Sequence, residues 1–130
     1  MTIEPGLTGD AAGTVDEERT AASLGSGDVA ALGTPAVLAL AEAAALAAVA
    51  GRLDDGRTTV GTWVELEHMA PTPVGARITA RATLLGVDGR TLEFEIEVSD
   101  PAGVVARGRH RRVVVDRERF LGGARDRLAR

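Results

Sequence analysis

Cysteine is absent from the sequence, and aromatic residues make up only 2% of it. Without cysteine the chain has no disulfide bond, no thiolate nucleophile and no cysteine-based metal site. Hydrophobic residues reach 45%, so Ala, Val and Leu must form most of the core. Small side chains gain less free energy on burial than Phe does. We therefore expect further copies of the chain to supply the missing burial, in a homodimer or a higher oligomer.

Basic residues are outnumbered by acidic ones, 15 against 19, which gives a net charge of −4. No basic stretch is interleaved with aromatic residues, so nucleic acid is not an expected partner. The N-terminus shows no basic region followed by an apolar run, and no secretory signal is expected. The apolar stretch Pro35–Ala50 contains Glu42 and is shorter than the roughly 20 apolar residues of a membrane span. We expect a cytoplasmic protein with no membrane partner.

A chain of 130 residues fits one domain. We expect a loose segment over residues 1–12, the domain over 13–120, and a charged tail over 121–130 that forms a short helix or frays. Within the domain, a weak strand is expected over 13–22. The Gly- and Ser-rich stretch that follows is interpreted as a flexible loop, in which Asp28 caps a short helical turn.

The strongest helix signal begins at Gly33-Thr34-Pro35. Thr34 suits the N-cap, and Pro35 suits the first helical position, where the missing N–H of proline costs nothing. The predicted helix continues over Ala36–Ala50 and ends at Gly51. It is apolar on every side, so every side must be covered. In a domain of this size, a sheet wrapped around the helix, together with a partner subunit, provides that cover.

Four later segments alternate apolar and polar residues, which is typical of half-buried strands. They span residues 59–68, 76–85, 92–98 and 104–115, with a hairpin turn at Asp88-Gly89. In the first of them we expect an inward row, opposite Trp63, of Val60, Thr62, Val64, Leu66 and His68. The order of strand, helix and four antiparallel strands predicts an α+β protein with the hotdog fold, in which an antiparallel sheet wraps around one long buried helix.

Glu42 and His68 are polar residues at positions expected to be buried. A buried carboxylate must be paired, or its pKa rises. Glu42 therefore either forms an ion pair with an Arg of the same or a second subunit, or has a functional role. His68 comes just before Pro71, at a strand end where a cleft can open, but a hydrogen-bonded core histidine explains it equally well. Thr34, taken alone, is explained as a helix cap.

Together these three residues are more informative. The Thr34 hydroxyl would lie at a helix N-terminus, where free N–H groups and the helix dipole favour a developing oxyanion. Glu42 follows eight residues later, about 12 Å along the axis at 1.5 Å per residue. The two side chains therefore cannot touch within one helix. They must approach a substrate from two ends, or the site must combine helices of two subunits.

Several stretches resemble the hotdog thioesterases related to fluoroacetyl-CoA thioesterase. They are residues 17–21, 25–29, 33–42 and 60–75, and the Gly-x-His-x-Arg motif of residues 108–112. The resemblance covers about residues 13–120. It implies a catalytic triad of Thr34, Glu42 and His68, a homodimer with the site at or near the subunit interface, and no metal or redox cofactor.

Further residues are expected to bind the substrate. Gly61 and the amides at the helix start are candidates for holding the oxyanion. Ala36 and Arg109 are candidates for substrate contact. The run of arginines within residues 108–112 is most simply a solvated strand face, but it could also meet the phosphates of coenzyme A. His110 is interpreted as structural. The loop over 21–33 has no aromatic residue, so we expect a small or medium acyl group other than fluoroacetyl.

The sequence thus predicts a thioesterase that cleaves an acyl-CoA or acyl-carrier thioester to free acid and thiol. His68 would act as general base or assist a nucleophile, and Glu42 would orient a water or attack the acyl group. The alternative is a non-catalytic hotdog dimer that binds acyl-CoA or an acyl carrier protein. A hydratase or dehydratase of the same fold ranks third, because it requires the histidine and the acid in a different order.

Overall fold

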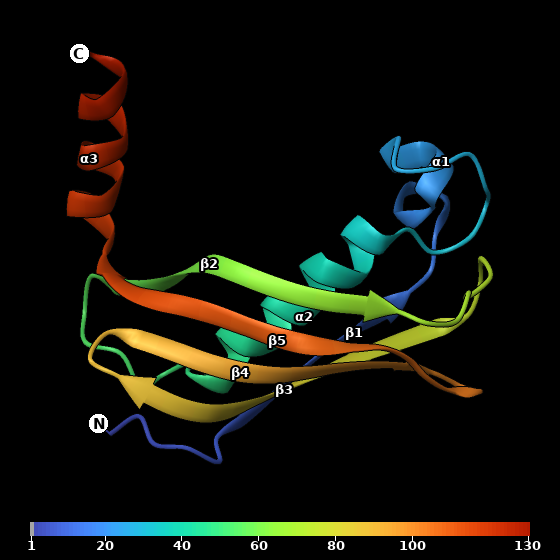
Figure 1. Ribbon diagram of the computed structural model, residues 1–130, viewed down its shortest axis with the longest axis horizontal. Helices are drawn as coiled ribbons and strands as arrows, with labels where there is room; N and C mark the ends of the chain where they lie inside the picture. The colour runs from blue at the N-terminus through green and yellow to red at the C-terminus, as the bar shows by residue number, and fades with distance from the viewer. Residues whose placement is uncertain (1) are drawn as a thin grey trace.

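The computed structural model describes residues 2–130 as a curved five-stranded sheet that holds one long helix (Figure 1). In chain order the elements are β1 (Thr8–Thr14), η1 (Glu17–Arg19), α1 (Ala21–Leu24), α2 (Thr34–Ala48), β2 (Arg57–His68), β3 (Arg77–Asp88), β4 (Thr91–Asp100), β5 (Gly103–Asp116) and α3 (Arg117–Leu128). The strands pair antiparallel in the order β1-β3-β4-β5-β2. β1 and β2 are therefore the two edges of the sheet.

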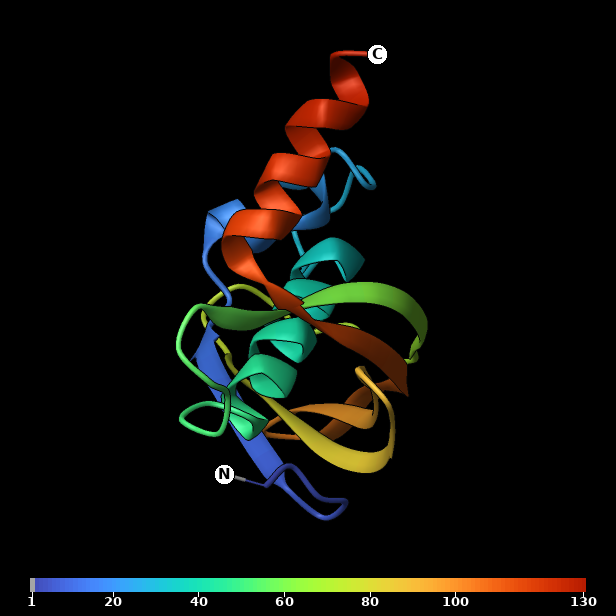
Figure 2. The same ribbon diagram turned by 90° about the vertical axis from the view of Figure 1, so that its left-hand side faces the viewer.

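The apolar core lies between α2 and the face of the sheet that curves around it (Figure 2). The inward rows of β3 and β4 are buried, and they consist of Ile78, Ala80, Ala82, Leu84, Leu92, Phe94, Ile96 and Val98. α2 meets these rows with Val37 and four alanines, whose small side chains let the helix approach the sheet. The α+β class, the single long helix and the sheet wrapped around it were predicted from the sequence and are confirmed.

Gly9 of β1 marks a close approach between this strand and α2. A Cβ here would overlap the backbone nitrogen of Ala48 and the carbonyl oxygen of Ala44. We expect Gly9→Ala to lower the free energy of unfolding by about 1–3 kcal/mol, because strand and helix must move apart. Gly86→Ala in β3 is the matched control, since nothing lies within 4 Å of its added Cβ. Urea denaturation measures both variants, and equal loss of stability in the two would contradict this packing.

The N-terminal region differs from the prediction. The strand expected over 13–22 is wrong, because the strand in this region, β1, spans Thr8–Thr14. It begins inside the segment 1–12 that was expected to be loose. Met1 of that segment lies outside the described residues. β1 consists of Thr, Gly, Asp and Ala, and it therefore lacks the large apolar residues that mark a strand. The short helix expected after Asp28 is also wrong. Its counterpart is α1, which Thr20 caps by accepting a hydrogen bond from the backbone N–H of Ser23.

An irregularity in β2 changes which of its residues face α2. The register of pairing with β5 shifts between Gly61 and Trp63, so Thr62 is an extra residue in β2. The insertion of one residue puts Gly61 and His68 on the same face, where strict alternation would put them on opposite faces. The expected inward row is therefore right for His68 and wrong for Val60 and Thr62. Sequence alternation alone does not reveal such a bulge.

One side of α2 is left uncovered by the chain's own sheet. Its exposed apolar residues recur at helical spacing along that side, and they are Pro35, Ala39, Ala43, Leu46 and Ala47. An exposed apolar stripe of this kind marks a contact surface. The expected cover by a partner subunit stays a prediction.

The C-terminal helix α3 extends away from the sheet, at the end of the molecule opposite α1 (Figure 1). Its side chains are exposed or half-buried. Of the two outcomes expected for the charged tail, the structure shows the helix. Within residues 2–130, no helix is long and apolar enough to cross a membrane.

Candidate active site

Backbone hydrogen bonds tie the start of α2 to the segment that follows β2. The N–H of Leu32 donates to the carbonyl oxygen of Thr72 at 2.9 Å. The N–H of Gly33 donates to the carbonyl oxygen of Arg19 at 2.8 Å, which fixes the same segment from its other side. As a result Thr34, the first residue of α2, lies beside His68, the last residue of β2.

The Thr34 hydroxyl and Nδ1 of His68 form a hydrogen bond of 2.8 Å. The expected capping role of Thr34 is wrong, because Gly33 is the N-cap of α2 and Thr34 is already helical. The hydroxyl is therefore free to bind the imidazole. Nε2 of His68 is buried and finds no hydrogen-bond partner among residues 2–130. Such an atom costs about 1–3 kcal/mol, so a partner from outside the chain would stabilise this arrangement.

An open pocket of about 340 Å³ adjoins this pair. Its wall is mostly apolar and comes from the α1–α2 segment and the turn after β2. Apolar residues in this wall include Ala21, Val29, Leu32, Met69 and Ala70. Thr34 and His68 are polar groups at its edge. An apolar chain can therefore lie in the pocket while a polar group attached to it reaches the hydroxyl and the imidazole.

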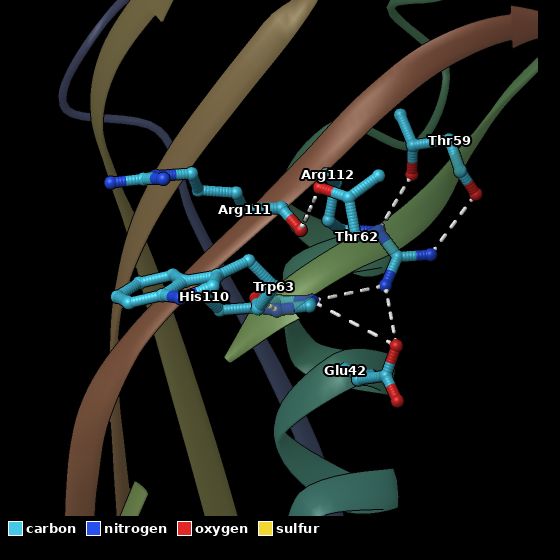
Figure 3. A network of polar contacts seen from close by, with 7 residues as sticks. All are labelled: Glu42, Thr59, Thr62, Trp63, His110, Arg111 and Arg112. Carbon is cyan, nitrogen blue, oxygen red and sulfur yellow. Dashed lines mark hydrogen bonds and ion pairs between the residues drawn. The ribbon is translucent and has the colours of Figure 1, made fainter. Parts of the chain in front are cut away.

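Glu42 binds a buried arginine deeper under the sheet (Figure 3). Nη1 of Arg112 donates to Oε2 of Glu42 at 3.1 Å. Arg112 is 6% exposed, whereas the side chain of Glu42 is 39% exposed. The ion pair expected of Glu42 thus exists within one chain, and it leaves the carboxylate accessible while its cation is covered.

Gly61 of β2 lies directly against this carboxylate. A Cβ at position 61 would overlap Oε2 of Glu42, and it would come within 3.2 Å of Cε1 of His110. Only glycine leaves the carboxylate room to reach Arg112. Gly61, which was expected to hold the substrate oxygen, therefore also leaves the space in which the Glu42 carboxylate contacts Arg112.

His110 completes the network as a neutral imidazole. Its Nδ1 lies 2.8 Å from the carbonyl oxygen of Trp63, and because a carbonyl can only accept, Nδ1 carries the proton. Nε2 lies 3.2 Å from Nη1 of Arg112, which can only donate, so Nε2 accepts. Burial lowers the pKa of the His110 imidazole, although the Trp63 hydrogen bond acts in the opposite direction.

The expected site residues thus fall into two groups within one chain. Thr34 and His68 form one group at the mouth of the pocket, and Glu42 belongs to the network under β5. Arg109 belongs to neither group. It is exposed on the outer face of β5, where its Nη1 lies 3.7 Å from Oε2 of Glu93. Ala36 faces a second hollow, of about 390 Å³, along the exposed side of α2.

Comparison with known proteins agrees with this fold. The model of the family described as fluoroacetyl-CoA-specific thioesterase matches residues 15–118. The chain belongs to this family. One relative, the fluoroacetyl-CoA thioesterase of Streptantibioticus cattleyicolor, is 33% identical over 84 residues, which are 65% of this chain. The match spans 60% of that relative's length.

Solved structures of this thioesterase family superpose on nearly the whole chain. A fluoroacetyl-CoA thioesterase structure has a TM-score of 0.90 at 26% identity and covers 97% of this chain and 98% of its own. A variant in complex with acetyl-CoA gives 0.91 at 25% identity, with 96% and 98% covered. A thioesterase superfamily member from Thermus thermophilus gives 0.88 at 23% identity, with 98% and 94% covered, and supports the fold alone. The predicted hotdog fold and the family resemblance are confirmed.

In this thioesterase family member, sequence reasoning missed the role of Arg112. The Arg run was expected to be a solvated strand face, but Arg112 is buried. The signal was available in the alternation of β5, since Ala106, His110 and Arg112 share the inward face with a period of two. Because arginine is rarely buried unless it is paired, this position called for an acidic partner such as Glu42.

Proposed function

We propose that this chain hydrolyses a small or medium acyl-CoA-type thioester. The observation that carries the proposal is the hydrogen bond between Thr34 and His68 at the edge of an apolar pocket. The pocket suits an acyl chain, and the hydroxyl–imidazole pair stands where the thioester carbonyl would lie. A relative that acts on fluoroacetyl-CoA and a related structure that holds acetyl-CoA support coenzyme A as the carrier.

The proposed site combines two copies of the chain. Glu42 lies about 12 Å along α2 from Thr34, too far for both to act on one carbonyl within one copy. At the β2 edge Trp63 and Val64 are 38% and 36% exposed, so this edge is open to a second copy. A two-fold axis near the middle of β2 would bring the His68 end of one strand toward the other end of its mate. Each of two equal sites then takes Thr34 and His68 from one copy and Glu42 from the other.

In the proposed reaction, water adds its oxygen to the acyl carbon and a proton to the sulfur, giving free acid and thiol. His68 assists the attacking group as a base, because an imidazole nitrogen without a hydrogen can accept a proton. Glu42, held by Arg112, orients the water or attacks the acyl carbon itself. N–H groups at the start of α2 and at Gly61 would stabilise the oxyanion.

The test is release of free thiol from a panel of saturated acyl-CoAs, from acetyl to decanoyl. We expect turnover, with kcat/KM rising about fourfold for each added methylene until the pocket is filled, because each buried methylene contributes about 0.8 kcal/mol. Fluoroacetyl-CoA is included, and it should gain nothing over acetyl-CoA in a pocket without aromatic residues. The same panel attached to an acyl carrier protein tests the second carrier.

Two outcomes would reject this proposal. If acyl-CoAs bind but no carrier thioester is cleaved, the protein is the non-catalytic binding dimer. If an enoyl-CoA gains water across its double bond while saturated thioesters stay intact, the protein is a hydratase. Calorimetric binding and absorbance of the enoyl group distinguish these outcomes from hydrolysis.

A further inference from the structure

The Arg112 guanidinium is held from several directions at once (Figure 3). Its Nε donates to Oγ1 of Thr59 at 2.8 Å, and its Nη2 donates to the carbonyl oxygen of Thr59 at 3.0 Å. Nη1 has two acceptors, Nε2 of His110 at 3.2 Å and Oε2 of Glu42 at 3.1 Å. A planar group with four fixed acceptors has one orientation, and in that orientation one N–H points at Glu42.

His110 differs from the other acceptors because it can lose its role by gaining a proton. Its imidazole is 2% exposed, and the carbonyl oxygen of Trp63 fixes the proton on Nδ1. A protonated His110 would turn an N–H of Nε2 toward the N–H of Arg112, so a donor would face a donor. Two cations would then lie together in a buried place, which is costly.

We propose that His110 is a positioning residue of the thioesterase site, whose neutral Nε2 aligns Arg112 so that Arg112 holds the Glu42 carboxylate against Gly61. This inference rests on the proposed function, in which Glu42 acts on the substrate. His110 itself touches neither the pocket nor the Thr34–His68 pair. Its hydrogen-bonded link to the Glu42 carboxylate runs through Arg112.

The surroundings of His110 contain the charges that this role requires. The ionisable groups that face it are Arg112 on its own strand and Glu42 from α2, with Oε2 of Glu42 3.9 Å from its Nε2. β4 contributes the uncharged ring of Phe94, with its centroid 6.4 Å from that of His110. β2 contributes the Trp63 carbonyl oxygen as a hydrogen-bond acceptor, and its Gly61 lies beside Cε1 of His110. The Glu42 carboxylate and the buried imidazole thus both accept from Nη1 of Arg112, which carries two N–H groups.

Two substitutions separate positioning from packing. His110→Gln places a carbonyl oxygen where Nε2 was, so Arg112 keeps an acceptor, but the side chain no longer titrates. His110→Leu fills similar space and offers no acceptor. We expect His110→Leu to lower kcat about 10- to 100-fold with KM nearly unchanged, because a misplaced catalytic group slows the chemical step more than it weakens binding. His110→Gln should recover most of that loss. Arg107→Gln, at an exposed position of the same strand, is the control and should leave both constants unchanged.

An NMR measurement tests the hydrogen bonds without relying on turnover. In the wild-type protein at neutral pH, the ¹⁵N signals of His110 should show a proton on Nδ1 and none on Nε2. The guanidinium protons of Arg112 should give separate, slowly exchanging signals in the wild type and in His110→Gln, and should merge in His110→Leu. A proton found on Nε2 at neutral pH would overturn the inference.

The kinetic outcomes also distinguish the two proposals. If the wild type cleaves acyl-CoAs, Glu42→Gln is inactive and His110→Leu keeps full kcat, the positioning role is wrong and the thioesterase assignment stands. If His110→Gln and His110→Leu lose equal activity, the acceptor is not what matters and the inference fails. If the wild type cleaves no thioester, the proposed function fails, and the positioning role fails with it.

Discussion

Replacing Glu42 with glutamine is expected to lower kcat by about three orders of magnitude, within the range that removal of a catalytic acid or base produces. Glutamine has the same shape, and its side-chain oxygen can still accept the Nη1–H of Arg112, 3.1 Å from the carboxylate in the native protein. The network that fixes the helix to β5 should therefore persist. What is lost is the negative charge and the ability to take a proton or attack an acyl carbon. The measurement is thiol release at saturating acyl-CoA, with circular dichroism to show that the variant is folded.

Glu97→Gln is the matched control for this experiment. Glu97 is an exposed carboxylate in the middle of the sheet, on the face of β4 that points away from α2. It carries the same charge change without contact to the pocket or to Arg112, and its kcat should equal that of the wild type. Full activity in Glu42→Gln would show that the Glu42–Arg112 pair is an ion pair of the core, which is the alternative that the sequence left open.

The part of the fold that sequence could predict is the part in which side-chain periodicity and burial agree. Residues 78–84 of β3 and 92–98 of β4 alternate, and every apolar residue of their inward rows is buried, so their faces were assigned correctly. α2 has Pro35 in its first turn and the left-handed Gly51 three residues beyond its last residue, Ala48, and the backbone preferences of both do not depend on the rest of the chain.

The part that sequence could not predict depends on contacts between distant segments. β1 is a strand because β3 pairs with it, not because Thr8–Thr14 favours extended backbone. The bulge in β2 at Thr62 is likewise invisible to a pattern of alternation, yet it decides that Gly61 and His68 share a face. Local propensity carries no information on either feature.

The candidate site shows the same division. Glu42 and His68 could be identified as candidates because each is a polar residue in an otherwise apolar pattern. Arg112 was hidden in a run of arginines, because only its strand register separates it from the exposed Arg111, which lies over the ring of Trp63. The hydrogen bond between Thr34 and His68 joins two segments far apart in the chain, and no local pattern predicts that contact.

The second large effect is expected when two inactive variants are combined in one dimer. Glu42→Gln lacks one half of the proposed site, and His68→Asn lacks the other half. In a mixed dimer, one of the two sites would hold both defects and the other would hold neither. We therefore expect isolated mixed dimers to regain about half of the wild-type activity, as the two-fold symmetry of the interface requires. Coexpression with two different affinity tags isolates the mixed dimer for a thiol-release assay.

A second pair of variants makes this experiment decisive. Thr34→Val and His68→Asn both damage the half-site that the 2.8 Å hydrogen bond holds together within one chain. Their mixed dimer has a defect in each site and should remain inactive. Recovery in the first pair and not in the second is the result that a shared site requires. If neither pair recovers, Glu42 acts within its own chain, and the two groups of residues must reach the substrate from opposite ends of one α2 helix.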